Sequence, residues 1–535
     1  MANGMTPTRA TASATSADTA NERNGNQLRA RLVRLSILLT ILLGAALIRV
    51  STLDNHGVWI DETWAVTTPN FHYDTNDIYP KFFEYPQTRA LPEARRQLLR
   101  NLYDLHPVVQ ICYMAVSDMH PPLYWVLSYY WTRLFGESLY AIRSFPVLTG
   151  VATVLVVLLL AETLFGLPVA IVAGLLLAAS PMHVHYSQMA RNYSLATFLV
   201  SLSYLMLFAA LRGRPTRLVL ACYGFTIWLA LLTNYYTVFF VAAQLVHVAI
   251  RTWRGDRKLG RWAIVYLGVA ICYAPWLPAL YVQTVMRNPT TQSQLMSLNL
   301  GTIVAQLYAL GLTPSATTVL LSSSWFNFLS VINAIFVLGL LGYAAWKARE
   351  QDREVMGGLL FWIVVPVLAL GALSLVKPMY SVKALLPIVP GFCIVLAFVV
   401  ASHRRAIHWI GATTLLLAAM LGSQWLWPTY PGIDSTEDTR GAVADVGVMI
   451  QPSDDVYVSP ASYRDGVWYY LRRDYVSLGG TPESTAVSPS TTYDSWLFRF
   501  WDTTRPSPIA AGRTPDETHK FFGVSVYHWR ARASQ

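Results

Sequence analysis

Two short acidic motifs stand out in a chain that is otherwise strongly apolar. The first is Trp59-Ile60-Asp61-Glu62, directly after the first long apolar run. The second is Asp118-Met119-His120-Pro121-Pro122-Leu123-Tyr124, at the start of a shorter apolar stretch. Carboxylates beside a bilayer are costly to desolvate, so acidic motifs framed by membrane segments indicate chemistry at the membrane surface. A carboxylate in such a place can take the proton of a hydroxyl group within hydrogen-bond reach.

The composition argues against a set of soluble domains and against a nucleic-acid partner. Hydrophobic residues are 54% of the 535 residues and charged residues are 13%, whereas soluble domains have about 25% charged residues. The net charge of +10 comes from short basic clusters between apolar runs, which is typical of membrane topology. The four cysteines have no metal-ligand spacing, and only Cys112 lies outside an expected span, so no disulfide framework is expected.

The apolar runs predict a mainly α-helical, polytopic transmembrane protein with about eleven spans. A membrane-spanning helix needs about 20 mostly apolar residues. The first run lacks a small-residue cleavage site at its end, so we expect an uncleaved span rather than a signal peptide. The expected spans are 35–50, 140–164, 167–185, 193–211, 217–234, 236–250, 262–282, 325–346, 356–376, 382–401 and 408–427.

Basic residues cluster in alternate loops and predict the sidedness of the chain. The positive-inside rule places the N-terminus and these loops in the cytoplasm. They are the segments 212–217, 251–261, 347–353 and 404–405. Both acidic motifs then lie outside, in a loop over residues 52–139. Within it, the apolar stretch 121–135 is short for a span and is expected to be a re-entrant or interfacial helix, because a span there would put the basic loops outside.

Three regions are expected along the chain. Residues 1–30 are rich in Ala, Thr, Ser and Asn and are expected to be a disordered cytoplasmic segment. Residues 31–427 form the membrane domain, and residues 428–535 form a small extracytoplasmic α/β domain. The expected elements of that domain are a strand near 454–459, a helix near 463–473 and a strand near 523–529.

Five segments, in order and all on the outward side, resemble motifs of the GT-C membrane glycosyltransferases. The resemblance covers the N-terminal 400 residues and is to the bacterial branch related to protein O-mannosyltransferases and to the lipid A aminoarabinose and galacturonic acid transferases. The segments are Trp59-Ile60-Asp61-Glu62, His120-Pro121-Pro122-Leu123-Tyr124, Arg143-Ser144-Phe145-Pro146 with Gly150, Ser180-Pro181 with Tyr186-Ser187-Gln188-Met189-Ala190-Arg191, and Tyr380-Ser381-Val382-Lys383-Ala384-Leu385-Leu386-Pro387 with Pro390-Gly391.

The resemblance implies an inverting glycosyltransferase of the bacterial inner membrane. Its donor would be a polyprenyl-phosphate sugar from the outer leaflet, and its acceptor a hydroxyl of an envelope glycan, lipid or protein on the periplasmic face. Asp61 then matches the catalytic base, and Glu62 orients either that base or the acceptor. This fits the chemistry, because an attacking hydroxyl must lose its proton to a group within hydrogen-bond reach.

The leaving group of that reaction is a lipid phosphate, so cations must stabilise the charge that develops. Arg143, Arg191 and Lys383 stand at outward ends of expected spans, and Tyr380 adds a hydroxyl donor. The family often has Arg where Lys383 stands, and Lys offers a point charge rather than a bidentate fork. Arg143 as a snorkelling residue and Arg191 as a headgroup anchor are the structural alternatives.

Asp118 and His120 leave two interpretations open. They are candidates for binding the acceptor or a divalent metal ion, as the resemblance implies for some relatives. Alternatively, Asp118 and His120, which precede Pro121 and Pro122, cap and fix the start of the re-entrant or interfacial helix. Two or three ligand-type residues do not specify a metal. A divalent metal ion therefore stays an open alternative, and no other cofactor is assigned.

A transporter or flippase of lipid-linked sugars is the alternative function, and a non-catalytic membrane scaffold is a third. Transporters carry binding groups near the bilayer midplane, whereas the expected spans here are nearly free of ionisable residues and the charges collect at their outer ends. That distribution favours catalysis at the surface. The chain has no Gly-rich phosphate loop, so a nucleotide-sugar donor is not expected.

Overall fold

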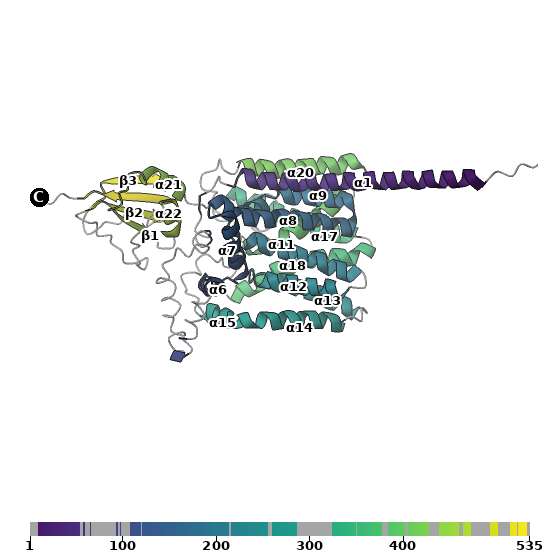
Figure 1. Ribbon diagram of the computed structural model, residues 1–535, viewed down its shortest axis with the longest axis horizontal. Coiled ribbons are helices and arrows are strands. Elements are labelled where there is room, and N and C mark those ends of the chain that lie inside the picture. The colour runs from purple at the N-terminus through teal and green to yellow at the C-terminus, as the bar shows by residue number, and fades with distance from the viewer. Residues whose placement is uncertain are drawn as a thin grey trace, which may run out of the picture.

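The computed structural model shows a bundle of apolar helices with a small α/β domain beyond one end of it (Figure 1). It describes residues 9–53, 57–58, 62, 65, 93–94, 97, 107–118, 120–212, 216–254, 259–285, 324–348, 350–376, 383–401, 405–426, 438–459, 464–471, 493–500, 514–521 and 523–531. Among the candidate site residues, Asp61 and Tyr380 lie outside these ranges.

Each of the eleven expected spans overlaps one helix or a run of consecutive helices. Within the described residues, five helical stretches are long and apolar enough to cross a membrane, and α9 with α10, bent by 55°, makes a sixth. The others are shorter apolar helices. The polytopic, mainly α-helical fold is therefore confirmed. The helices are α1 (Arg9–Ser51), α8 (Leu139–Phe165), α9 (Leu167–Ala179), α10 (Pro181–Gln188), α11 (Tyr193–Arg212), α12 (Arg217–Leu231), α13 (Thr237–Trp253), α14 (Leu259–Tyr273), η3 (Ala274–Trp276), α15 (Leu277–Val285), α17 (Ser324–Lys347), α18 (Glu350–Val376), η6 (Lys383–Leu385), α19 (Ile388–Ala401) and α20 (Ala406–Leu426).

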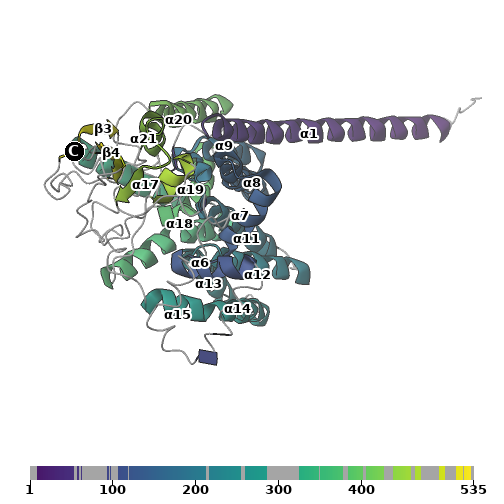
Figure 2. The ribbon, with the colours of Figure 1, turned by 60° about the vertical axis from the view of Figure 1, so that its left-hand side comes forward.

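Helix α1 begins much earlier than its apolar run. Residues 9–30, for which the sequence predicts disorder, continue the helix, and the N-terminal half of α1 projects past the other helices (Figure 1, Figure 2). Extending a helix that is already formed costs less than nucleating a new one, and Ala and Arg have high helix propensity. The expectation for residues 9–30 is therefore corrected from disorder to helix.

Small residues let the central helices approach closely. A Cβ atom on Gly174 of α9 would lie 2.3 Å from Leu158 Cδ2 of α8, and one on Gly150 of α8 would lie 2.6 Å from Ser187 Cβ of α10. Close backbone approach of this kind provides the packing between helices in a membrane, where the hydrophobic effect is absent. Gly150 therefore lets α10 pack against α8 at Ser187, a residue of the fourth motif segment.

Two short helices lie at the end of the bundle nearest the C-terminal domain. They are α6 (Pro107–Asp118) and α7 (Leu123–Phe135), and the axis of α7 runs across those of the long helices (Figure 1). The Leu123 amide donates to Leu232 O at 3.0 Å, which ties the start of α7 to the end of α12. This arrangement agrees with the expected interfacial helix at 121–135. The ends of α11, α13 and α17, with basic residues in their last turns, lie at the opposite end.

The C-terminal domain is a four-stranded sheet with two helices. The strand order is β1-β2-β4-β3, in which β1 and β2 are parallel and the other pairs are antiparallel. The α/β character and the elements β1, α22 and β4 agree with the sequence prediction. The elements are α21 (Thr439–Val446), β1 (Asp455–Ser459), α22 (Arg464–Leu471), β2 (Ser495–Phe500), β3 (Glu517–Phe521) and β4 (Val524–Trp529).

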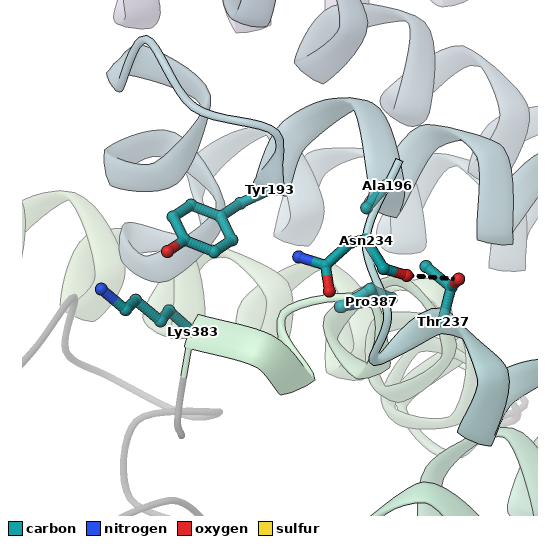
Figure 3. A pocket seen from close by; sticks show the side chains of 6 residues that line it. All are labelled: Tyr193, Ala196, Asn234, Thr237, Lys383 and Pro387. Carbon is teal, nitrogen blue, oxygen red and sulfur yellow. Dashed lines mark hydrogen bonds between the residues drawn. The ribbon is translucent and has the colours of Figure 1, made fainter. Parts of the chain in front are cut away.

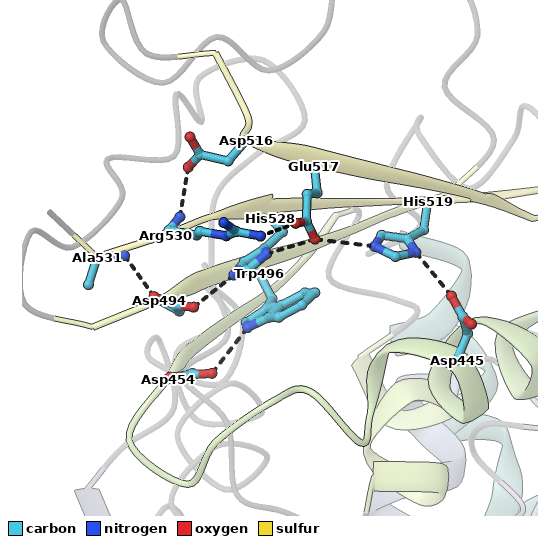
Figure 4. Close-up of polar contacts among 10 residues, drawn as sticks. All are labelled: Asp445, Asp454, Asp494, Trp496, Asp516, Glu517, His519, His528, Arg530 and Ala531. Carbon is cyan, nitrogen blue, oxygen red and sulfur yellow. Dashed lines mark hydrogen bonds and ion pairs between the residues drawn. The ribbon is translucent and has the colours of Figure 1, made fainter.

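A polar network on the sheet fixes the register of β2 against β4 (Figure 4). The His528 ring stacks on Trp496 with centroids 3.7 Å apart, and its Nε2 lies 2.9 Å from Asp494 Oδ2. Burial alone would raise the pKa of Asp494, but the Ala531 amide, His528 and Arg530 together lower it. The stabilisation that Asp494 provides is therefore present above its usual pKa and is lost as the pH falls through the lowered value.

Candidate active site

A buried ion pair joins the first acidic motif to the start of α8. Arg143 Nη2 lies 2.6 Å from Glu62 Oε2, and Arg143 Nε donates to Glu62 Oε1 at 3.0 Å. The two side chains are only 3% and 2% exposed as residues. Two parallel hydrogen bonds between a guanidinium and a carboxylate set both distance and orientation. Two positions that are 81 apart in the sequence are thus joined at one defined point.

The same two side chains also bind three backbone groups. Arg143 donates to Leu53 O at 2.9 Å and to Gly57 O at 2.8 Å, while the Ala190 amide donates to Glu62 Oε1 at 2.8 Å. The pair therefore connects the end of α1, the acidic motif, α8 and the turn after α10. We call these five residues, Leu53, Gly57, Glu62, Arg143 and Ala190, the acidic clamp.

Local sequence explains why Arg143 reaches the clamp. The Ser138 side chain accepts from the Ala141 amide at 3.1 Å and caps the first turn of α8, which carries Arg143. The guanidinium points into the protein, so Arg143 is not a snorkelling side chain. Its hydrogen bonds to Glu62, Leu53 and Gly57 lie within the clamp, whereas the family resemblance implies a phosphate contact.

Arg191 is also buried, at 4% exposed, and lies against an aromatic side chain of α7. Its guanidinium carbon is 5.3 Å from the centre of the Trp125 ring, and the following Asn192 donates to Thr233 O at 2.8 Å. A cation over an indole ring is stabilised by the ring quadrupole. The turn between α10 and α11 is therefore held between α7 and the end of α12, and Arg191 is not an exposed headgroup anchor.

Lys383 lines a recess beside the first turns of α11, α13 and α19 (Figure 3). Its Nζ is 5.7 Å from the centre of the Tyr193 ring. The other lining residues are Ala196, Asn234, Thr237 and Pro387. The Thr237 hydroxyl donates to Asn234 O at 2.7 Å, which fixes the turn beneath the recess. Lys383 thus adds a cation beside polar and aromatic groups.

The remaining candidates are placed only in part. His120 is partly buried, and its amide lies 3.3 Å from Ala115 O, where α6 ends. Asp118 is the last residue of α6, and the structure describes its backbone but not its side chain. Within the described residues, no three His, Cys, Asp or Glu side chains are grouped as metal ligands. The contact of the His120 amide with the last turn of α6 agrees with the helix-positioning interpretation, and binding of the acceptor or a divalent ion by Asp118 and His120 stays a prediction.

Sequence reasoning missed Arg49, which lies inside the first span. It is fully buried, and its Nε donates to Ser187 Oγ at 2.9 Å while its Nη2 is 2.8 Å from His183 Nδ1. An arginine within an apolar span is costly, and that cost is the signal that marks it. Arg49 ties α1 to α10, the helix that precedes the turn with the clamp residue Ala190.

The site can now be compared with known proteins. Residues 119–282 match the family model described as dolichyl-phosphate-mannose-protein mannosyltransferase. No curated protein matches the chain. The crystal structure of the Archaeoglobus fulgidus oligosaccharyltransferase in the apo form superimposes with a TM-score of 0.51 at 13% identity, over 87% of this chain and 69% of that one. The chain has the GT-C fold.

Two structures of ArnT from Cupriavidus metallidurans are also similar in shape. The apo form has a TM-score of 0.48 and the form bound to undecaprenyl phosphate has 0.47, each at 15% identity over 78% of this chain and 89% of that one. The family model spans α7 to α15, so the segment of the GT-C fold that it covers contains Arg143, Ala190 and Arg191. The GT-C fold that the motifs predict is confirmed by the Archaeoglobus fulgidus structure.

Proposed function

We propose that the protein is an inverting membrane glycosyltransferase that moves a sugar from a polyprenyl-phosphate donor to a hydroxyl of a cell-envelope glycan, lipid or protein. The acidic clamp is the observation that supports this most. It gathers three segments of the proposed motif set at one end of the GT-C bundle. The family model supports the donor class, since the proteins it describes use a dolichyl-phosphate sugar.

The clamp favours Asp61 over Glu62 as the base. Both Glu62 oxygens already accept hydrogen bonds from Arg143, and Oε1 also accepts from the Ala190 amide. These three hydrogen bonds occupy most of the roughly four lone-pair positions of the carboxylate and leave little room for an acceptor hydroxyl. Glu62 is therefore assigned the positioning role, and its neighbour Asp61 is assigned the proton-accepting role.

The transfer is a single displacement at the anomeric carbon. The acceptor oxygen attacks from the face opposite the phosphate and gives its proton to the Asp61 carboxylate. The new carbon–oxygen bond forms as the bond to the phosphate oxygen breaks, and the electron pair leaves with the lipid phosphate. Arg191 and Lys383 are assigned to stabilise that charge, with Tyr380 as an additional hydroxyl donor. Arg143 supports the site through the clamp.

The proposed location is the bacterial inner membrane, with the N-terminus in the cytoplasm and the C-terminal domain in the periplasm. The basic loops and the C-terminal domain lie at opposite ends of the bundle, which agrees with this orientation (Figure 1). A reporter that is active only in the periplasm should therefore be active when fused after Gln535. The same reporter inserted among residues 251–261 should be inactive, and activity there would invert the scheme.

Lys383→Ala should weaken use of the donor. A hydrogen bond to a charged group contributes about 1.5–3 kcal/mol, so the KM for a polyprenyl-phosphate sugar should rise about tenfold or more. The measurement is initial-rate transfer with titrated donor in detergent or liposomes. Lys347→Ala is the matched control, because Lys347 Nζ also lies over a tyrosine ring, 5.4 Å from that of Tyr343, but at the opposite end of the bundle. Equal donor KM values in the two variants would remove Lys383 from the site.

A further inference from the structure

One helix of the C-terminal domain makes direct hydrogen bonds to the acidic-motif segment. The Val58 amide donates to the Tyr470 hydroxyl at 2.8 Å, and the Leu139 amide donates to the Tyr469 hydroxyl at 2.9 Å. Val58 lies four residues before Glu62, and Leu139 is the first residue of α8, four residues before Arg143. Consecutive tyrosines of α22 therefore bind the two segments that the acidic clamp also joins.

Packing supports the same connection. Tyr469 is 8% exposed and belongs to the buried cluster formed by residues such as Val58, Tyr124 and Ala190. Tyr470 packs both against that cluster and against the core of the C-terminal domain. Burial raises the pKa of Tyr470 to about 12, so its hydroxyl stays neutral at physiological pH. A neutral hydroxyl can accept the Val58 N–H without placing a second negative charge beside Glu62.

The rest of α22 is held by the sheet. Val467 is fully buried in the domain core, and Leu471, four residues later, packs on the same core. The helix lies between β1 and β2 in the sequence and contacts β1 and α21. One face of α22 thus belongs to the C-terminal domain, while Tyr469 and Tyr470 reach the membrane domain.

We propose that α22 is a positioning element of the active site, in which Tyr470 and Tyr469 hold the segment before Glu62 and the first turn of α8 in the arrangement needed for transfer. This rests on the proposed function. Neither tyrosine contacts the reacting atoms in this role. The C-terminal domain is then required for a high transfer rate, although it supplies no catalytic group.

The contact is tested by hydrogen exchange on the full-length protein. Tyr470→Phe keeps the ring and removes the acceptor for the Val58 N–H. A hydrogen bond of ordinary strength corresponds to about a twofold to tenfold change in an equilibrium, so exchange in the peptide containing Val58 should accelerate by about that factor. Tyr457→Phe is the matched control, because Tyr457 lies in β1 and packs with the cluster of Leu497 and Trp529 rather than with α22.

The role in catalysis is tested by kinetics on the same variants. Tyr470→Phe should lower kcat about twofold to tenfold with an unchanged donor KM, and Tyr457→Phe should have wild-type values. In an Asp61→Asn background, Tyr470→Phe should leave the residual rate unchanged, because the base that it positions is already missing. A loss of rate through general instability would instead lower the yield of folded protein and persist in that background.

The outcomes separate this inference from the function on which it rests. Unchanged exchange at Val58, or equal kcat in Tyr470→Phe and wild type, overturns the role of α22 while leaving the transferase intact. A wild-type protein that transfers no sugar from polyprenyl-phosphate donors overturns the proposed function, and the exchange result still decides whether Tyr470 holds the segment.

Discussion

Asp61→Asn should lower the rate of sugar transfer by about 10²- to 10⁴-fold, the usual effect of removing a general base. The amide keeps the size and much of the hydrogen bonding of the carboxylate but does not accept the acceptor's proton. Glu62 does not replace it, because its oxygens are occupied by Arg143 and the Ala190 amide. The measurement is transfer of a radiolabelled sugar from a polyprenyl-phosphate donor, alongside donor binding.

Donor binding should survive in Asp61→Asn, because the proposed phosphate contacts come from Arg191 and Lys383. Asp352→Asn makes the same chemical change in the first turns of α18, at the basic end of the bundle, and should transfer normally. Transfer by Asp61→Asn within a few-fold of wild type would exclude Asp61 as the base and leave Asp118 as the next acid to test. A transporter or scaffold would also be insensitive to this change.

Arg143→Met should destabilise the fold by about 3–5 kcal/mol, because it leaves the Glu62 carboxylate buried without its partner. The ion pair is almost fully buried, so the solvent screening that weakens surface pairs is absent. Less folded protein should survive graded heating in detergent before size-exclusion chromatography. The loss of the Leu53 and Gly57 contacts should also lower the transfer rate of the protein that remains.

The double variant Arg143→Met with Glu62→Gln distinguishes the ion pair from ordinary packing. A buried pair replaced on both sides leaves no uncompensated charge, so much of the lost stability should return. Transfer should stay low, since the acidic motif is no longer held against α8. If Arg143→Met alone is as stable as wild type, the pair does not hold the motif, and the case for Asp61 as the better base loses its structural support.

Properties that depend on short stretches of chain could be read from the sequence. The length and apolarity of the runs determined the helices of the bundle, because a bilayer requires about 20 apolar residues with all backbone groups bonded internally. Alternating basic loops determined which helix ends lie together. Short motifs in a fixed order were sufficient to predict the GT-C fold, and alternation along β1 and β4 revealed a sheet after the last span.

Elements with weak local patterns were missed. The strand β2, Ser495–Phe500, is buried at every position and so shows no alternation, while β3, Glu517–Phe521, is a mainly polar edge strand. Both are defined by pairing with β4 rather than by their own residues. The N-terminal part of α1 was assigned to disorder from composition, although it continues a helix nucleated by the span.

The contacts of the charged residues were decided only by the tertiary structure. Glu62 and Arg143 lie 81 residues apart, and nothing local in either segment specifies that they pair. Arg143 stands at an outward helix end in the sequence, as a phosphate-binding residue would, but the fold directs its guanidinium inward to Glu62. The contacts of Tyr469 and Tyr470 likewise join positions more than 300 residues apart. Such pairings depend on which helices pack together, and that is a property of the whole chain. Spans and sidedness depend instead on the hydropathy of each segment and on the basic residues in the loops beside it.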